Sequence, residues 1–320
     1  MSMRSFTLYT LSLFLFLCLL SLVGWFFNPF VSHAANSTPT IPIPDALSRL
    51  ENPQVTSLTF WDPSIGSVGN LDLTATSVLS YDLTTNTVLY AKNPTKELPM
   101  ASLTKIMTAI IALENPKTPD SYLVSNRDLV GEDSMGLSAG ESLPLSDLLY
   151  GLVLHSGNDA AETIADNYPQ GTAAFVVAMN EKAQALGLTH THFTNPTGLE
   201  GDGDQHTTAA DLLIMTRYAL LQFPLFDQVV STFDYTIPAT ATHKAYDLEN
   251  ETNLLSSYPG VKGVKDGYTP QAGLCLVTYL DYGGHQILAV ILGSDNRRGE
   301  MIDVLDYSLK KLGITPPQHE

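Results

Sequence analysis

Segments with strand-forming composition lie at both ends of a long globular stretch of this chain. Residues 76–82 and 87–90 are rich in Thr, Val, Leu and Tyr and are separated by a short polar turn, which predicts a β-hairpin. Residues 274–280 and 286–292 flank a Gly-Gly turn and predict a second hairpin. Between the hairpins, apolar residues recur at helical spacing. The predicted helices begin near Ser102 and then cover residues 145–154, 160–165, 173–186 and 208–221, with a last one over 300–312.

The order of these segments predicts an α+β fold and not a doubly wound one. The two hairpins can pair into one antiparallel sheet, with the first and last helices packed on it. The helices inserted between them, over about residues 115–255, then form a second lobe. A cleft between the two lobes is the expected place for an active site. We expect this domain to span residues 71–315.

Residues 1–35 differ in composition from the rest of the chain. Arg4 is the only charged residue there, and an apolar run extends from Phe6 to Phe30. This pattern predicts an export signal, so the rest of the chain is expected outside the cytoplasm, at the cell surface, in a periplasm or secreted. Two fates stay open. The signal is cleaved after Ala34, or it remains as a membrane anchor, because the run over residues 6–30 is close to a full membrane span.

Residues 36–70 are expected to form a Pro/Thr-rich linker and an N-terminal extension before the domain. The chain carries 16 basic and 33 acidic residues, which give a net charge of −17. A surface this acidic argues against nucleic acid as a partner. Cys275 is the single cysteine outside the first 35 residues, and its apolar surroundings predict a small buried side chain on a strand.

Three short strings, well separated along the chain, predict nucleophilic chemistry at a serine. The first is Ser102-Leu103-Thr104-Lys105, which places Ser102 and Lys105 on one face of a helix. A serine hydroxyl needs a base within hydrogen-bond reach. Burial and neighbouring cations can lower the pKa of a lysine until it accepts the serine proton. The backbone N–H of a serine near a helix start can also stabilise an oxyanion.

The second string, Ser156-Gly157-Asn158, lies between two predicted helices, where a loop can present side chains. Ser156 is a candidate for passing protons between Lys105 and the leaving group. Asn158 is a candidate for binding a substrate carbonyl and for contacting Lys105. Helix capping by Asn158 or Asp159 is the alternative interpretation.

The third string is Lys265-Asp266-Gly267, followed by Tyr268 and Thr269. On a strand that borders the cleft, Lys265 would supply a fixed positive charge near Ser156. Gly267 would let substrate backbone approach closely. The N–H of Tyr268 is a candidate second donor to an oxyanion.

A Ser-x-x-Lys string by itself is weak evidence, because a second copy runs from Ser308 to Lys311. That copy lies on the last predicted helix, where we expect a solvated face. Ser102 differs because it follows a predicted hairpin and opens an apolar helix. The pair His190 and His192 and the segment Glu200–Asp204 are expected to be loops, since neither has the partners of a metal site.

Taken together, these residues give the chain a clear family likeness: over about residues 70–312 it resembles the serine-type D-alanyl-D-alanine carboxypeptidases, the low-molecular-mass penicillin-binding proteins. Besides the three strings, the match extends over Pro99–Thr108, Leu154–Ala161 and Thr191–Leu199. The resemblance implies the DD-peptidase/β-lactamase-like fold. Many relatives continue into a β-rich C-terminal domain, which this chain is expected to lack, so any membrane attachment would come from residues 6–30.

The resemblance also implies a reaction. Ser102 would be acylated by the terminal D-Ala–D-Ala bond of a peptidoglycan stem pentapeptide, D-Ala would leave, and water would release the shortened peptide. Lys105 would be the base, Ser156 and Asn158 the second wall of the site, and Lys265 the electrostatic anchor. The resemblance further implies covalent inhibition by β-lactams and no metal or organic cofactor.

Asp266 departs from the family pattern, because relatives often carry a Thr there whose hydroxyl helps hold the terminal carboxylate of the substrate. An ionised Asp only accepts hydrogen bonds and repels a carboxylate. Three outcomes stay open. Asp266 turns away and pairs with a cation while Thr269 donates to the carboxylate; the enzyme prefers cross-links, as an endopeptidase; or it is weakly active and mainly a binding protein. A β-lactamase shares the three strings but needs a positioned carboxylate, and no Glu stands in that setting.

Overall fold

The computed structural model describes residues 68–130, 133–252 and 254–319. The predicted export signal and nearly all of the predicted linker lie outside the described residues. Among the described residues, no helix combines the length and the apolar character that crossing a membrane requires.

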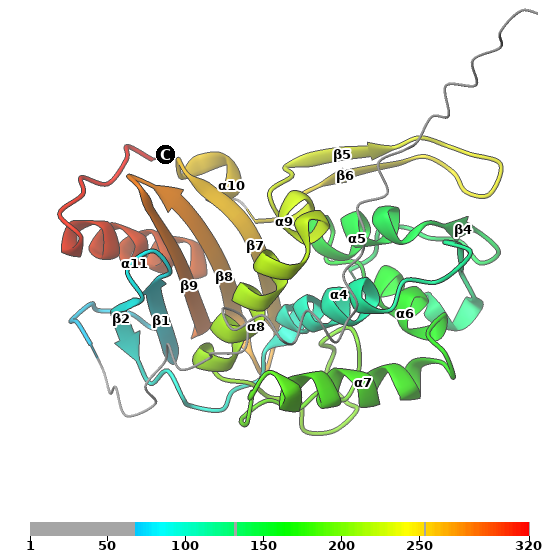
Figure 1. Cartoon of the computed structure of the whole chain (residues 1–320), viewed down its shortest axis with the longest axis horizontal. Coiled ribbons are helices and arrows are strands. Elements are labelled where there is room, and N and C mark those ends of the chain that lie inside the picture. The colour runs from blue at the N-terminus through cyan, green and yellow to red at the C-terminus, as the bar shows by residue number, and fades with distance from the viewer. Residues whose placement is uncertain (1–67, 131–132, 253, 320) are drawn as a thin grey trace, which may run out of the picture. The chain divides into compact units, whose positions relative to one another are not determined.

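A five-stranded antiparallel sheet joins the two ends of the described chain (Figure 1), in the order β2-β1-β9-β8-β7. Strand β1 pairs with β9 from Ser77 opposite Leu292 to Asp82 opposite Ile287. The two predicted hairpins therefore form one sheet, as expected. The strands are β1 (Ser77–Asp82), β2 (Thr87–Lys92), β7 (Val261–Thr269), β8 (Gly273–Tyr282) and β9 (His285–Ser294).

Alternation of side chains along the strands divides the core between the two faces of the sheet. Leu276 and Leu280 of β8 pack with Met301 and Leu305 of helix α11 (Arg297–Lys311). Cys275 and Val277 of the same strand belong to a second cluster on the opposite face, shared with the other helices. Cys275 is fully buried, as predicted.

The helices between β2 and β7 form a lobe on that second face, called the helical lobe below (Figure 1). The four helices expected over residues 145–221 are confirmed, each within two residues at either end. The elements of this lobe are η1 (Ala101–Thr104), α4 (Lys105–Glu114), η2 (Asn126–Asp128), α5 (Leu145–Leu154), α6 (Asn158–Asp166), α7 (Thr172–Ala185), α8 (Ala209–Gln222) and α9 (Pro224–Val230), and α10 (Leu254–Ser257) follows.

The expectation that the first helix packs on the sheet is confirmed only for its start, because η1 contacts β7 and β8. Helix α8 covers β1 and β9 on this face, whereas α4 packs against α5, α6, α7 and α8. Every residue of α4 from Lys105 to Ala112 is buried. A helix that is buried all round belongs in the centre of a helical layer, because it has no polar side to turn to water.

The region 115–255 is also not purely helical. Two antiparallel ribbons lie within it, β3 (Tyr122–Leu123) with β4 (Ser142–Leu143) and β5 (Asp234–Ile237) with β6 (Tyr246–Glu249). Their strands have two or four residues each, which is too short for alternation to distinguish them from loops.

Ser308 corrects a second expectation. It is fully buried, not on a solvated face. Its hydroxyl lies 2.7 Å from that of Ser80 on β1 and donates to the carbonyl of Val304 at 2.6 Å. Lys311 is exposed and donates to the carbonyl of Leu89 at 2.9 Å. Helix α11 turns Ser308 toward the sheet, so this Ser-x-x-Lys string holds the fold together and does not face a cleft.

Candidate active site

Ser102 lies in the short helix η1 that leads into α4. The preceding residue, Ala101, has a φ of +50°, so the backbone is left-handed where the chain enters this turn. Such a conformation is uncommon for a residue with a Cβ and is held by its surroundings. Ser102 is 8% exposed and Lys105 only 1%. The turn thus leaves the serine slightly exposed and keeps the lysine buried beneath it.

The amine of Lys105 is enclosed by three oxygen atoms. Its Nζ lies 2.8 Å from Ser102 Oγ, 2.8 Å from Asn158 Oδ1 and 2.8 Å from the carbonyl oxygen of Thr197. A neutral amine has two N–H bonds and one lone pair. If the amide and carbonyl oxygens accept the two N–H bonds, the lone pair is left for the hydroxyl proton of Ser102.

The pKa of Lys105 fits this role. Burial, and next the charge of Lys265, lower the pKa of Lys105 to about 7, although the carboxylates of Asp133, Asp266 and Glu251 act in the opposite direction. A base with a pKa near neutrality is half-deprotonated at physiological pH and still binds a proton well.

The loop that supplies the Thr197 carbonyl is tied to the nucleophile turn. Asn195 Oδ1 accepts hydrogen bonds from the N–H and hydroxyl of Thr197 and from the N–H of Gly198, at 2.8 to 3.1 Å. Thr108 of α4 donates to the carbonyl of Pro196 at 2.6 Å. The segment Thr191–Leu199 matches the family pattern in the sequence, but only the fold shows that the Thr197 carbonyl contacts the amine of Lys105.

Ser156 and Asn158 lie at the junction of α5 and α6, as the sequence indicated. Ser156 has a φ of +52° and is 3% exposed. The side chain of Asn158 reaches Lys105 and does not cap α6, so the capping interpretation was wrong for this residue. The Asp159 carboxylate accepts hydrogen bonds from the backbone N–H groups of residues 135–137 at 2.9 to 3.1 Å and so holds that loop.

Strand β7 runs along the nucleophile turn. Lys265 and Gly267 lie opposite Val277 and Cys275 of β8, on the face of the sheet that the helical lobe covers. A Cβ on Gly267 would lie 2.9 Å from the backbone nitrogen of Ser102, closer than side-chain carbons normally approach. Gly267 therefore allows the strand to lie directly against the turn. Tyr268 is 60% exposed, and the Thr269 hydroxyl accepts the N–H of Ala272 at 3.1 Å.

Asp266 points to the other face of the sheet and bridges two cations. One of its oxygens lies 2.8 Å from the ammonium of Lys265, and the other accepts a hydrogen bond from the guanidinium of Arg297. Burial disfavours the charged form, but the Lys265 ammonium and the Arg297 guanidinium outweigh it and hold the pKa of Asp266 below its usual value. Asp266 therefore pairs with cations, as the first of the three outcomes required, whereas the role of Thr269 in that outcome stays a prediction.

Arg297 is a residue of this site that the sequence analysis missed. It is the first residue of α11 and donates to the carbonyl of Gly267 at 2.9 Å as well as to Asp266. The expected helix began at residue 300 and the expected strand ended at residue 292, so Arg297 lay outside the predicted elements. The signal in the sequence that could have identified Arg297 is its position just after the second predicted hairpin.

A pocket of about 270 Å³ lies next to the nucleophile turn and is lined by Ala101, the residue before Ser102. Ala101 and the loop from Gly198 to Gln205 form one side, and Thr269 and Gln271 at the end of β7 form the other. This pocket lies where the helical lobe meets the edge strand of the sheet, and Ser102, Lys105 and Lys265 are not among the residues that line it. His190, His192 and Glu200–Asp204 are in or near loops, and no cluster of metal-binding side chains occurs within the described ranges.

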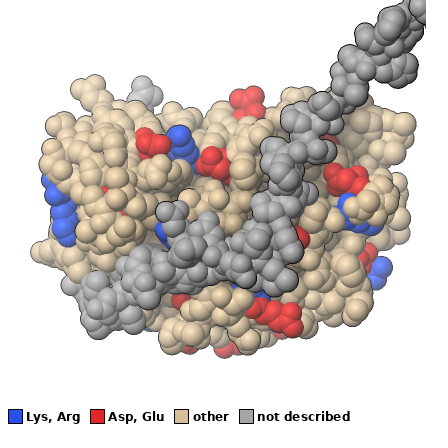
Figure 2. Space-filling view, viewed as in Figure 1, with Lys and Arg blue, Asp and Glu red and all other residues tan. Residues whose placement is uncertain are grey.

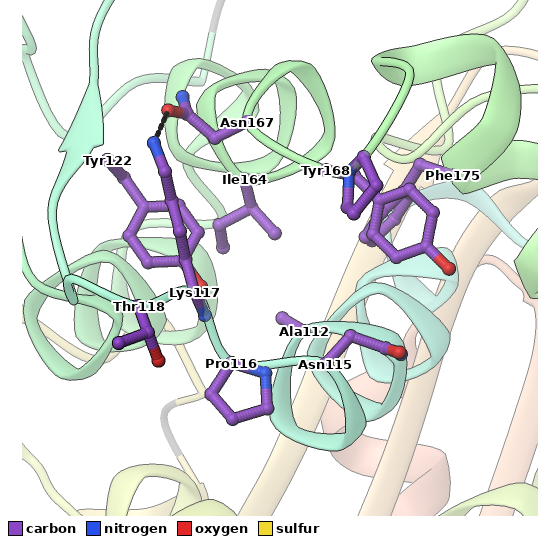
Figure 3. Close-up of a pocket in the computed structure, with 11 residues that line it drawn as sticks. Ala112, Asn115, Pro116, Lys117, Thr118, Tyr122, Ile164, Asn167, Tyr168 and Phe175 are labelled. Carbon is purple, nitrogen blue, oxygen red and sulfur yellow. Dashed lines mark hydrogen bonds between the residues drawn. The ribbon is translucent and has the colours of Figure 1, made fainter.

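A separate cavity of about 470 Å³ lies in the helical lobe near the ends of α4 and α6 (Figure 3). It has an apolar floor that includes Ile164 and Phe175. The rim carries Lys117, whose ammonium donates to Asn167 Oδ1 at 2.8 Å. None of the candidate catalytic side chains lines this cavity.

Charged residues on the face drawn in Figure 2 are scattered among uncharged ones.

Comparisons with known proteins point to one enzyme family. The family described as D-alanyl-D-alanine carboxypeptidase matches residues 65–296. The D-alanyl-D-alanine carboxypeptidase DacF of Bacillus subtilis is 33% identical over 251 residues, which are 76% of this chain and 64% of that protein. The D-alanyl-D-alanine endopeptidase of Pseudomonas aeruginosa is 33% identical over 222 residues, 67% of this chain and 70% of that protein.

The fold has a counterpart among solved structures. The crystal structure of the Streptomyces K15 DD-transpeptidase matches with a TM-score of 0.70 and 30% identity, over 76% of this chain and all of that one. The chain spans 64% of the length of its Bacillus relative, so the comparison with that protein covers only a part of it.

Proposed function

Because the chain belongs to the D-alanyl-D-alanine carboxypeptidase family, we propose that it is a serine D,D-carboxypeptidase acting on peptidoglycan stem pentapeptides. The observation that carries this proposal is the enclosed amine of Lys105, 2.8 Å from the hydroxyl of Ser102. The reaction is removal of the terminal D-alanine through an acyl-enzyme on Ser102. No metal or organic cofactor enters the proposed steps.

In the first step, neutral Lys105 accepts the hydroxyl proton as Ser102 Oγ attacks the carbonyl carbon of the scissile bond. The backbone N–H groups of Ser102 and Tyr268 are the proposed donors to the oxyanion. Ser156 passes the proton to the leaving amine, and Asn158 holds both Lys105 and the substrate backbone. Water then attacks the ester and releases the shortened peptide. A β-lactam acylates Ser102 by the same first step and stays attached.

The substrate determines where the domain works. Peptidoglycan lies outside the cytoplasmic membrane, so an extracytoplasmic catalytic domain follows from the proposal. Residues 1–35 are proposed to export it, either as a cleaved signal or as an anchor through residues 6–30.

A second candidate is D,D-endopeptidase activity on peptide cross-links. The charge of Asp266 beside Lys265 favours it, and relatives from Pseudomonas aeruginosa and Escherichia coli are named as endopeptidases. Both activities use the same acyl-enzyme and differ only in the leaving group.

Labelling with a fluorescent penicillin tests the proposal. We expect stable labelling of the wild type, loss of labelling in Ser102→Ala, and full labelling in Ser308→Ala, which removes the serine of the other Ser-x-x-Lys string. Release of D-Ala from a pentapeptide identifies the carboxypeptidase. Rapid turnover of the penicillin would instead indicate a β-lactamase, and absence of labelling a non-catalytic protein.

A further inference from the structure

We infer that the Asp266 carboxylate occupies, in the free protein, the cationic subsite that a substrate carboxylate would need, so that the site favours leaving groups without a negative charge. Such leaving groups are an amidated residue or a side-chain amine in a cross-link. The inference rests on one part of the proposed function, the acyl-enzyme reaction at Ser102. Of the two activities proposed above, it favours the endopeptidase, because the leaving group of a carboxypeptidase carries a carboxylate.

The bonds made by Asp266 are those that a bound carboxylate would make. One oxygen takes an ammonium at 2.8 Å and the other takes a guanidinium. Arg297 is fixed in this pose by its second bond, to the carbonyl of Gly267 at 2.9 Å. Carboxylates bound to proteins are typically recognised by cations arranged in this way. Asp266 is thus an internal ligand of Lys265 and Arg297.

Of the two cations that Asp266 binds, Lys265 is the one that we expect to face the substrate. Lys265 starts on the face of β7 that the helical lobe covers, whereas Asp266 lies opposite Leu276 on the face of α11. Their side chains can meet because β7 is the edge strand of the sheet. Among the described residues, the only hydrogen bond that the Lys265 ammonium makes is the one to Asp266. The ammonium makes no hydrogen bond to Ser156.

Burial makes this occupation costly to reverse. Asp266 is 5% exposed and Lys265 is 1% exposed. A second carboxylate near the same two cations would repel the first at short range, where water screens poorly. An acid substrate therefore has to displace Asp266 or share its cations. A neutral leaving group leaves both ion pairs intact.

The test compares two substrates that differ by one charge. A blocked Lys–D-Ala–D-Ala tripeptide and its C-terminal amide are hydrolysed by the wild type, Asp266→Thr, Asp266→Asn and the control Asp281→Asn. Asp281 is an acid on the neighbouring strand β8, paired with exposed Lys262 at 3.6 Å. Released D-alanine and D-alaninamide are quantified by chromatography.

We expect both Asp266 variants to raise the acid-to-amide ratio of kcat/KM by about tenfold, the effect of one charge-assisted hydrogen bond, and Asp281→Asn to leave it unchanged. Differences in leaving-group chemistry cancel, because every protein is measured on both substrates. A ratio that stays at the wild-type value in the Asp266 variants overturns the inference.

Two further measurements keep the outcomes distinct. If the Asp266 variants fail to fold, the rates of the wild type on the acid and amide substrates test the inference by themselves. Comparable rates on the two substrates support the inference, and a preference for the acid above about thirtyfold overturns it. Penicillin labelling of Ser102 is measured in parallel. Labelling with an unchanged ratio rejects only the role of Asp266, whereas absence of labelling rejects the proposed function itself.

Discussion

The amine of Lys105 lies 2.8 Å from the carbonyl oxygen of Thr197, a residue 92 positions later in the chain. Because this carbonyl takes one N–H and Asn158 Oδ1 can take another, the lone pair of a neutral lysine is directed at Ser102. The loop around Thr197 therefore helps α4 to orient the base.

Asn195→Ala tests the orientation of Lys105. The variant removes the oxygen that accepts two N–H groups and a hydroxyl of the loop, so the Thr197 carbonyl is released. We expect penicillin acylation of Ser102 to slow about tenfold or more, with about 2 kcal/mol lost from the free energy of unfolding. Stopped-flow or gel labelling measures the rate.

Asn180→Ala is the matched control. Asn180 accepts the N–H of Phe193 at 3.0 Å and donates to two backbone carbonyls. It makes no hydrogen bond to Lys105 or to the three residues whose oxygen atoms surround the Lys105 amine. It is expected to lose similar stability and to keep its acylation rate. Equal losses of rate in the two variants would show that the loop has only a general structural effect.

Gly198→Ala tests the packing of this loop on the nucleophile turn. Gly198 has a φ of +89°, and a Cβ there would lie 2.0 Å from the carbonyl oxygen of Ala101. The backbone has to move, so we expect loss of labelling and destabilisation by more than about 3 kcal/mol, measured by denaturant unfolding.

Gly201→Ala is the control that separates the effect of the steric clash in Gly198→Ala from the effect of backbone strain. Gly201 has a φ of +112° but has nothing within 4 Å of its would-be Cβ. It is expected to lose only about 1–2 kcal/mol, the cost of a left-handed conformation, and to be labelled normally. Normal labelling of Gly198→Ala would contradict the close contact.

The pH dependence of acylation follows from the pKa of Lys105, which is about 7. Only the neutral amine accepts a proton, so the acylation rate should rise about tenfold per pH unit below pH 7 and level off above it. Removing the charge of Lys265 removes a cause that lowers this pKa. In Lys265→Met the rise is therefore expected at higher pH.

Lys262→Met is the control for this shift. Lys262 is on the same strand, but its side chain is 49% exposed and pairs with Asp281. We expect its pH profile to match that of the wild type. A profile of the wild type that does not change between pH 6 and 8 would argue against Lys105 as the base.

Cys275 should resist thiol reagents in the folded protein. Burial raises the pKa of its thiol to about 11, so almost no thiolate is present at neutral pH. We expect no alkylation of Cys275 at pH 8 until denaturant unfolds the sheet, with peptide mapping used to separate it from Cys18. Modification of Cys275 in the native protein would mean that β8 opens locally.

The local pattern of the sequence determined most of the elements. Helix α5 has the predicted bounds Leu145–Leu154, because its apolar spacing and the polar turn after it are properties of ten adjacent residues. The hairpins, the serine with its lysine three residues later, and the loop at Ser156 were identified for the same reason. In each case the evidence lies within one turn or one strand.

Tertiary structure decided what such patterns leave open. Ser102 and Ser308 share a string, yet the first contacts the buried amine of Lys105 and the second lies between α11 and β1. The sequence singled out Asp266, but its second partner, Arg297, is 31 residues away and begins a different element. Side chains that meet across a fold are brought together by packing of whole helices and strands, and that packing depends on the complete core and not on any segment read alone.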